Sequence, residues 1–107
     1  MDLRNIDLNL LLLFSHIYRE RSISRAAIKL NLSQSAVSNS LAKLRERLQD
    51  PLFTRTSRGM TPTLRAKQLS EPINQALDLI QNSLKNEEDF DYSVSDRTFI
   101  IAVEDYG

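Results

Sequence analysis

Residues 33–43, with the sequence SQSAVSNSLAK, carry the side chains whose types and spacing point most directly to chemistry. If this stretch is helical with Val37, Leu41 and Leu44 turned inward, its opposite face presents short polar groups. Amide side chains can bond bidentately to N6 and N7 of adenine, and serine hydroxyls can donate or accept at several base edges. The predicted base-reading residues are Gln34, Ser35, Ser38, Asn39 and Lys43.

A solvated helix face is the plain alternative for these residues. Exposed helix faces usually favour Glu and Lys, whereas Ser and Asn are weak helix formers. A face rich in Ser and Asn is therefore a poor choice for helix stability alone. Its composition favours a helix that reads the major groove of DNA.

The charges of the chain are unevenly distributed, although its formal net charge is zero. Residues 1–70 hold 12 Lys and Arg against 5 Asp and Glu, and residues 71–107 hold 2 against 9. A basic first part can attract an anionic polymer such as DNA. The residues predicted to face phosphates, from the helices or from a basic loop, are Ser24, Arg25, Lys29, Ser33, Arg45, Arg55 and Arg58.

Two helices are predicted before the polar stretch. Asp7 or Asn9 can cap the first, whose apolar residues are numerous enough to be buried on two sides, one of which could meet another subunit. Ser24 can cap a short second helix, in which the adjacent Ala26 and Ala27 let another helix approach closely.

A tight turn is predicted between the second and third helices. Asn31 tolerates the left-handed backbone that such a turn requires. Leu32 is expected to plug the turn from inside, and Ser33 to cap the third helix by accepting from N–H groups near Ala36. The result is a helix-turn-helix.

Strands and a fourth helix follow. Pro51 stops the third helix, and strand-like residues at 52–55 and 60–61 flank the turn at 57–59, which predicts a small basic wing. Thr63 can cap a fourth helix that runs to about Ser83 and is kinked or divided at Pro72. Its apolar stripe consists of Leu69, Ile73, Ala76, Leu77, Ile80 and Leu84.

The end of the chain has the composition of a linker and a strand. Residues 86–96 begin with an acidic run and predict an interdomain linker, and residues 97–103 (RTFIIAV) predict a buried strand. One strand needs a partner, so residues 97–107 are expected to be the first strand of a truncated second domain. The alternatives are that the tail pairs with the wing or stays disordered.

Several function classes lack the residues that they need. Without cysteine there are no disulfides or thiolate metal sites, and His16 is the only histidine, with no clustered carboxylates beside it. The chain has no glycine-rich phosphate loop and no G-x-S-x-G elbow, so a small hydrolase has no catalytic constellation. No apolar run approaches the roughly 18 residues of a membrane span. We expect no catalytic residue, metal, cofactor or membrane contact.

Taken together, these residues resemble the LysR-type transcriptional regulator family. The family pattern runs through Phe14, residues 22–30 (SISRAAIKL), 33–38 (SQSAVS), Leu44 and 52–55 (LFTR). The resemblance covers residues 7–85 and continues into the tail. Residues 7–10 (DLNL) and 50–63 are most similar to the branch that contains the nodulation regulator NodD and the regulator LeuO.

The resemblance implies a mainly α fold: a winged helix-turn-helix of three helices and a two-stranded wing at residues 1–63, then a long linker helix at 64–85. It implies a sequence-specific, cytoplasmic regulator that binds double-stranded DNA as a homodimer, and as a tetramer at full length. The stripe on the linker helix would be the antiparallel dimer interface. A small-molecule inducer is implied only for the effector domain, of which this chain holds the first strand.

A helical protein-interaction or dimerisation module without DNA specificity is the alternative. Its basic face would meet an acidic partner, and it would suit the leucine-rich first helix and the stripe on the fourth. It does not explain the Ser- and Asn-rich third helix or the basic wing.

Overall fold

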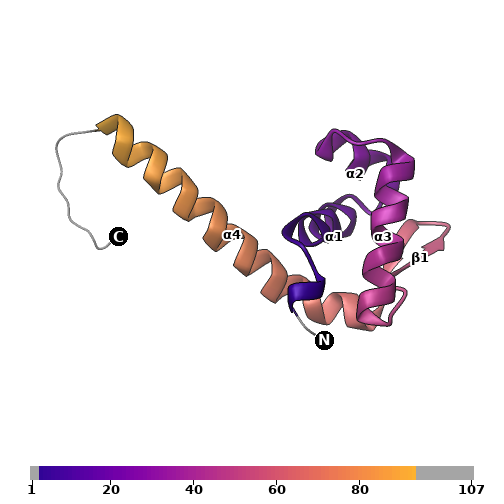
Figure 1. Cartoon of the computed structure of the whole chain (residues 1–107). Helices are drawn as coiled ribbons and strands as arrows, with labels where there is room; N and C mark the ends of the chain where they lie inside the picture. The colour runs from indigo at the N-terminus through magenta and orange to yellow at the C-terminus, as the bar shows by residue number, and fades with distance from the viewer. Residues whose placement is uncertain (1–2, 94–107) are drawn as a thin grey trace. The chain divides into compact units, whose positions relative to one another are not determined.

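A computed structural model of the chain describes the backbone of residues 3–93 and the side chains of residues 4–85. The predicted strand within 97–107 therefore lies outside the described residues. The first three helices pack on one another and adjoin the wing (Figure 1), so the predicted mainly α fold with a two-stranded wing is confirmed. In chain order the elements are η1 (Leu3–Asn5), α1 (Leu8–Glu20), α2 (Ile23–Leu30), α3 (Gln34–Leu48), β1 (Phe53–Thr56), β2 (Gly59–Pro62) and α4 (Leu64–Ser93).

Side-chain caps begin α1 and α3 as predicted. Asp7 Oδ1 accepts hydrogen bonds from the backbone N–H groups of Asn9 and Leu10, over 2.7 and 3.2 Å. Ser33 Oγ accepts from the N–H of Ala36 over 3.1 Å. These bonds satisfy donors that have no partner inside a helix.

The cap of α2 differs from the prediction. Ser22, and not Ser24, is the N-cap, because Ser22 Oγ accepts from the backbone N–H of Arg25 over 3.2 Å. Ser22 has the extended backbone of a cap, with a φ of −156°, whereas Ser24 already lies in the first helical turn. Ser24 instead shares a hydroxyl–hydroxyl bond of 3.0 Å with Ser22.

The turn between α2 and α3 has the predicted backbone and an unpredicted side-chain arrangement. Asn31 is left-handed, with a φ of 61°, which confirms the prediction. The backbone N–H of Leu32 turns back to the carbonyl of Ala27, over 2.9 Å. The Leu32 side chain is 48% exposed, so the expectation that it plugs the turn was wrong.

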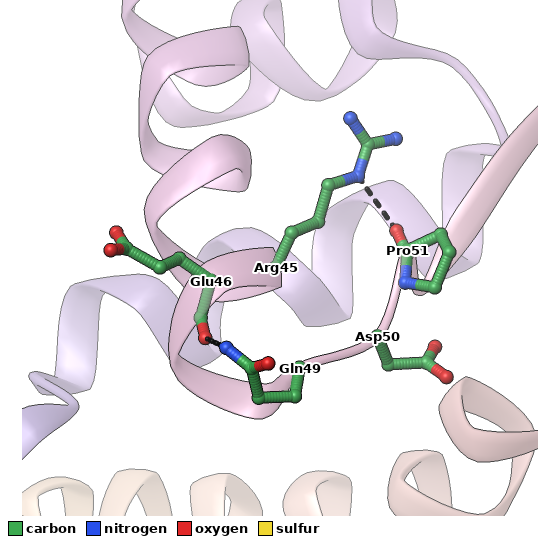
Figure 2. Close-up of a pocket in the computed structure, with 5 residues that line it drawn as sticks. All are labelled: Arg45, Glu46, Gln49, Asp50 and Pro51. Carbon is green, nitrogen blue, oxygen red and sulfur yellow. Dashed lines mark hydrogen bonds between the residues drawn. The ribbon is translucent and has the colours of Figure 1, made fainter.

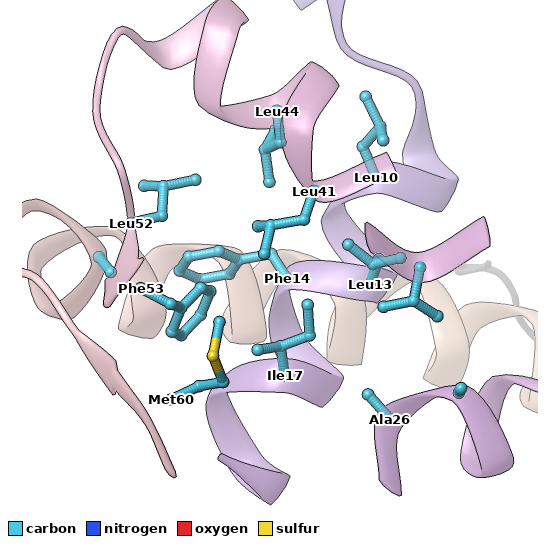
Figure 3. Close-up of a cluster of buried hydrophobic side chains, with 13 residues drawn as sticks. Leu10, Leu13, Phe14, Ile17, Ala26, Leu41, Leu44, Leu52, Phe53 and Met60 are labelled. Atoms are coloured by element: carbon cyan, nitrogen blue, oxygen red, sulfur yellow. The ribbon is translucent and has the colours of Figure 1, made fainter. Parts of the chain in front are cut away.

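The core of the first compact unit, which ends at Gln75, joins α1, α3 and the wing. Phe14 lies between the α3 leucines and Phe53 (Figure 3), and the two phenylalanine rings are 5.5 Å apart. Val37, Leu41 and Leu44 of α3 are at most 1% exposed. Burying one such side chain stabilises the fold by about 1.5–3 kcal/mol, so one whole face of α3 is held against the core.

The wing is a two-stranded antiparallel sheet in which Phe53 pairs with Pro62 and Thr56 with Gly59. Gly59 has a φ of 102°, a backbone conformation that favours glycine. The N–H of Met60, the next residue, donates to the carbonyl of Arg21 at the end of α1, over 3.0 Å. This bond fixes the wing on the helical body.

The loop between α3 and β1 is tied to the start of α4. Leu52 is fully buried and left-handed, with a φ of 65°. Its carbonyl accepts from the backbone N–H of Thr63 over 2.8 Å, and its N–H donates to Asp50 Oδ2 over the same distance. These bonds set the position of α4 relative to the wing.

Thr63 caps α4 as predicted, because its hydroxyl accepts from the N–H of Ala66 over 3.2 Å. The helix is a single element across Pro72 and is therefore not divided there. It continues to Ser93, past the predicted end near Ser83 and into the predicted linker at 86–96. Residues 86–93 contain neither Gly nor Pro to stop a helix. Their assignment to a linker between domains stays a prediction.

Candidate nucleic-acid interface

The predicted reading face of α3 is exposed along its length. The three inward residues Val37, Leu41 and Leu44 are buried, and the polar set turns away from them. Because the buried face fixes the rotation of the helix about its axis, the polar side chains project from a rigid support. The exposed members are Gln34, Ser35, Ser38, Asn39 and Lys43.

The two serines of the predicted phosphate set take part in local hydrogen bonds. Ser33 Oγ caps α3 and also lies 3.3 Å from Ser35 Oγ. Ser24 Oγ is bonded to Ser22 at the start of α2. Both serines are exposed, so their hydroxyls remain accessible from solvent at the starts of the two helices.

Four of the five predicted phosphate-facing cations are exposed. They carry net positive charge on α2 and on the wing, and none of them forms an ion pair within the part of the chain that the structure describes. Unpaired, exposed cations are what a polyanion needs for electrostatic attraction. They are Arg25, Lys29, Arg55 and Arg58.

Arg45, the fifth cation, was predicted to face a phosphate, and in this structure its guanidinium binds two backbone carbonyls. Its Nε donates to the carbonyl of Pro51 over 2.7 Å, and its Nη2 to that of Phe53 over 2.8 Å. Figure 2 shows the bond to Pro51 at the rim of a surface hollow that Glu46 and Gln49 also line. The half-buried Arg45 thereby joins the last turns of α3 to the loop that follows and to the first residue of β1. Arg45 is thus a loop-binding residue in this structure.

The predicted dimer stripe falls into two parts. Leu69 and Ile73 are half-buried and pack against the core of the first unit, and their part in a dimer interface stays a prediction. In the second unit, which begins at Ala76, the stripe is more open. Ile80 is 42% exposed and Leu84 52%, and Leu77 is half-buried.

One exposed side chain and one contact were not predicted from the sequence. Leu79, outside the predicted stripe, is 70% exposed and widens the apolar surface of α4. Ser15 Oγ, on the buried side of α1, donates to Asn74 Oδ1 over 2.7 Å. A serine among the leucines of a helix that is expected to be buried on two sides is a signal that could have pointed to such a bond.

His16 on α1 is partly enclosed. Burial lowers the pKa of its imidazole, the positive charges of Arg19 and Lys29 lower it further, and Glu20 opposes them. Its Nδ1 is buried and has no hydrogen-bond partner in the described part of the chain.

The described residues contain no group of three or more potential metal-binding side chains. Among them, too, no helix has both the length and the apolar character needed to cross a membrane.

A family model described as "Bacterial regulatory helix-turn-helix protein, lysR family" matches residues 8–67, which are α1 to the start of α4. The transcriptional activator NagR of a Ralstonia species is 51% identical over 107 residues, which are the whole of this chain and 36% of NagR. The transcriptional regulator LeuO of Escherichia coli K12 is 46% identical over 94% of this chain and 32% of its own length. The chain thus spans about a third of these relatives.

A solved structure has the same arrangement of elements. The probable transcriptional regulator PA0477 from Pseudomonas aeruginosa superposes with a TM-score of 0.77 and 39% identity, over 92% of this chain and 30% of that protein. The match to the family model covers more than half of the sequence, including the turn and the wing. The chain belongs to the LysR family of bacterial helix-turn-helix regulatory proteins.

Proposed function

We propose that this chain is the DNA-binding part of a transcription regulator and that α3 enters the major groove of double-stranded DNA. One observation carries the proposal: α3 has one face fully buried and an opposite face of exposed Ser, Gln, Asn and Lys side chains. A rigid helix with short polar groups at its N-terminal half is suited to base edges. The base-reading set is Gln34, Ser35, Ser38, Asn39 and Lys43.

The phosphate contacts belong to exposed groups of α2, the N-cap of α3 and the wing. Phosphate contacts position a protein on the duplex, whereas base contacts give sequence choice. Arg45 is left out of this set, because its guanidinium already binds the carbonyl of Pro51 in the loop after α3 and that of Phe53 at the start of β1. The proposed members are Ser24, Arg25, Lys29, Ser33, Arg55 and Arg58.

The regulator binds as a homodimer joined through α4. The part of α4 beyond the first unit has an apolar stripe of Ala76, Leu77, Ile80 and Leu84, of which Ile80 and Leu84 are at least 42% exposed. Such a stripe on a solvated helix favours pairing with a second helix. Two joined subunits would address half-sites one helical turn, about 34–36 Å, or a small multiple apart.

The full-length protein is a cytoplasmic regulator of transcription with a second domain after residue 96. The names of NagR, a transcriptional activator, and LeuO, a transcriptional regulator, support this role. Their length, about three times that of this chain, leaves room for an effector domain that binds a small-molecule inducer. At full length we propose tetramers, with the second domain supplying part of the contact.

Selection of bound sites from random DNA tests the proposal. The chain should enrich an inverted repeat with a fixed separation, and its affinity for that repeat should fall steeply between about 50 and 200 mM salt. The variant Gln34→Ala/Asn39→Ala should enrich no such repeat, while Gln81→Ala, which changes an exposed amide of α4, should select the wild-type sequence. If wild type enriches nothing, the chain is instead an interaction module without DNA specificity.

A further inference from the structure

A polar contact links α1 to α4 beside the apolar side chains of Leu69 and Ile73. We call α1–α3 with the wing the reading body. Ser15 is 5% exposed and Ser70 9%. Ser15 Oγ donates to Asn74 Oδ1 over 2.7 Å, and Asn74 Nδ2 donates to Ser70 Oγ over 3.4 Å. Arg19 Nη2 in turn donates to Ser15 Oγ over 3.5 Å. We call Ser15, Asn74 and Ser70 the polar clamp.

The polar clamp can fix the position of α4 along α1, which apolar contacts alone do not fix. Leu69 and Ile73 pack against the core beside it, but an apolar contact is non-directional and tolerates sliding. A hydrogen bond requires its donor and acceptor to lie within about 3.2 Å in a narrow range of angles. If α4 slid or rotated on α1, the hydroxyl of Ser15, a residue that is 5% exposed, would lose its acceptor on Asn74. A buried polar group without a partner costs about 1–3 kcal/mol.

The position of the clamp along α4 is equally specific. Asn74 lies two residues after Pro72 and one residue before the first unit ends at Gln75. Proline has no N–H, so the carbonyl of Gln68 lacks its usual donor in the helix. The side-chain bond therefore holds α4 at the turn where the backbone of the helix is weakest and just before it leaves the body.

We propose that Ser15 and Asn74 are positioning residues that set the seating of α4 on the reading body and, through it, the separation of the two half-sites that a dimer prefers. The inference rests on the proposed function, because half-site separation has meaning only for two reading heads joined by α4. Neither residue belongs to the exposed reading face of α3. Their loss should therefore change the choice of spacing and leave the contacts to a single half-site intact.

The experiment compares two affinities for each variant. One is for a duplex with a single half-site, and the other is for a series of duplexes in which the separation of the half-sites changes by single base pairs. One added base pair turns one half-site relative to the other by about a tenth of a helical turn. Wild type should bind the preferred separation best. Ser15→Ala and Asn74→Ala should reduce this preference by about 2- to 10-fold, the range of one net hydrogen bond, with unchanged affinity for the single half-site.

Two further variants separate positioning from general stability. Asn74→Asp keeps an acceptor for the Ser15 hydroxyl and should retain the wild-type spacing preference. Gln75→Ala removes the exposed amide next to Asn74 and should also behave like wild type. A preference that is unchanged in both Ser15→Ala and Asn74→Ala overturns the inference. If Asn74→Ala does not fold, Ser15→Ala, which deletes one hydroxyl, decides alone.

A distance measurement without DNA gives an independent readout. The chain has no cysteine, so Ser57→Cys in the wing turn places one spin label on each subunit. Wild type and Asn74→Asp should give a narrow label-to-label distance, and Ser15→Ala and Asn74→Ala a broader one. Equal widths overturn the inference. A wild type that gives no dipolar signal and selects no repeat contradicts the proposed function itself, and the inference with it.

Discussion

The hydroxyl of Thr63 donates to Asp50 Oδ2 over 2.7 Å, which joins the first residue before α4 to the loop that follows α3. The same carboxylate oxygen accepts from the N–H of Leu52, and the same hydroxyl accepts from the N–H of Ala66. One side-chain pair thus satisfies two backbone donors and closes the corner that supports the wing.

Breaking this corner should destabilise the first unit. Asp50→Ala leaves the Leu52 N–H and the Thr63 hydroxyl without their acceptor, at a cost of about 1–3 kcal/mol in the free energy of unfolding. Urea denaturation measures the loss, and a double-mutant cycle with Thr63→Val should give a coupling of about 0.5–3 kcal/mol. Asp78→Ala, at an exposed position of α4, is the control. Additive effects of the two corner substitutions would contradict the coupling.

A methyl group added at Gly59 would collide with the backbone of Arg21. A Cβ there would lie 2.6 Å from the carbonyl oxygen of Arg21, and the φ of 102° is strained for any other residue. Gly59→Ala should lower the free energy of unfolding by about 1–3 kcal/mol from backbone strain alone, and thermal denaturation measures this. Ser57→Ala, in the same turn but exposed, should stay within about 0.5 kcal/mol of wild type. A Gly59→Ala protein as stable as wild type would show that the wing can move away from α1.

The two amides of the reading face should each contribute to sequence choice. Gln34→Ala and Asn39→Ala should each weaken binding to the selected site by about 1–3 kcal/mol, because each removes a side chain that can bond bidentately to adenine. Titrations against single-base variants of the site should show that each substitution relaxes the choice of base at one position in each half-site. Gln81→Ala is again the control. Wild-type affinity and selectivity in both variants would assign the reading to other residues.

The exposed cations should set the salt dependence of binding. Lys29→Gln and Arg58→Gln should each reduce the slope of log affinity against log salt by about 1 per subunit, or about 2 for the dimer, and weaken binding on all sequences alike. Arg45→Gln provides the contrast, because it should lower stability by freeing the carbonyls of Pro51 and Phe53 while leaving the slope unchanged. If the slope of log affinity against log salt falls as much in Arg45→Gln as in Lys29→Gln, Arg45 also contacts a phosphate.

Stability should depend on pH through His16. Its pKa is lowered from the ordinary 6.5 in the folded chain, so the unfolded chain binds more protons between the two pKa values. The contribution of His16 is therefore fully present above about pH 6.5 and is lost as the pH falls through its folded pKa. Urea midpoints at about pH 7.5 and 5.5 measure the effect, and His16→Gln should reduce the difference between them. An identical difference in wild type and His16→Gln would assign the pH dependence to other groups.

Local signals in the sequence predicted much of the first unit. Asp7, Ser33 and Thr63 cap the helices that were expected of them, and Asn31 makes the predicted left-handed turn. Each of these features depends on a side chain and the backbone within a few residues of it. The short motifs at residues 22–30, 33–38 and 52–55 also resemble one family, and this resemblance does not depend on any tertiary contact.

The sequence alone does not settle which partner a residue meets. Ser22 and Ser24 have the same side chain, so either could cap α2. The backbone conformation selects Ser22, which is extended, whereas Ser24 is already helical. Helical spacing identified the stripe on α4, but it does not tell whether Leu69 packs inside its own chain or against another one. Likewise, no spacing rule places the Arg45 guanidinium on carbonyls six and eight residues away.

The left-handed corners of the first unit have a consequence for folding. Arg21, Asn31, Gln49 and Leu52 occupy these corners, and none of them is glycine. A side chain at such a corner adds strain to the native backbone, but it also restricts the denatured ensemble, which then loses less conformational entropy on folding. A chain with glycine at every corner would be more relaxed once folded and would begin from a far more diverse set of unfolded conformers.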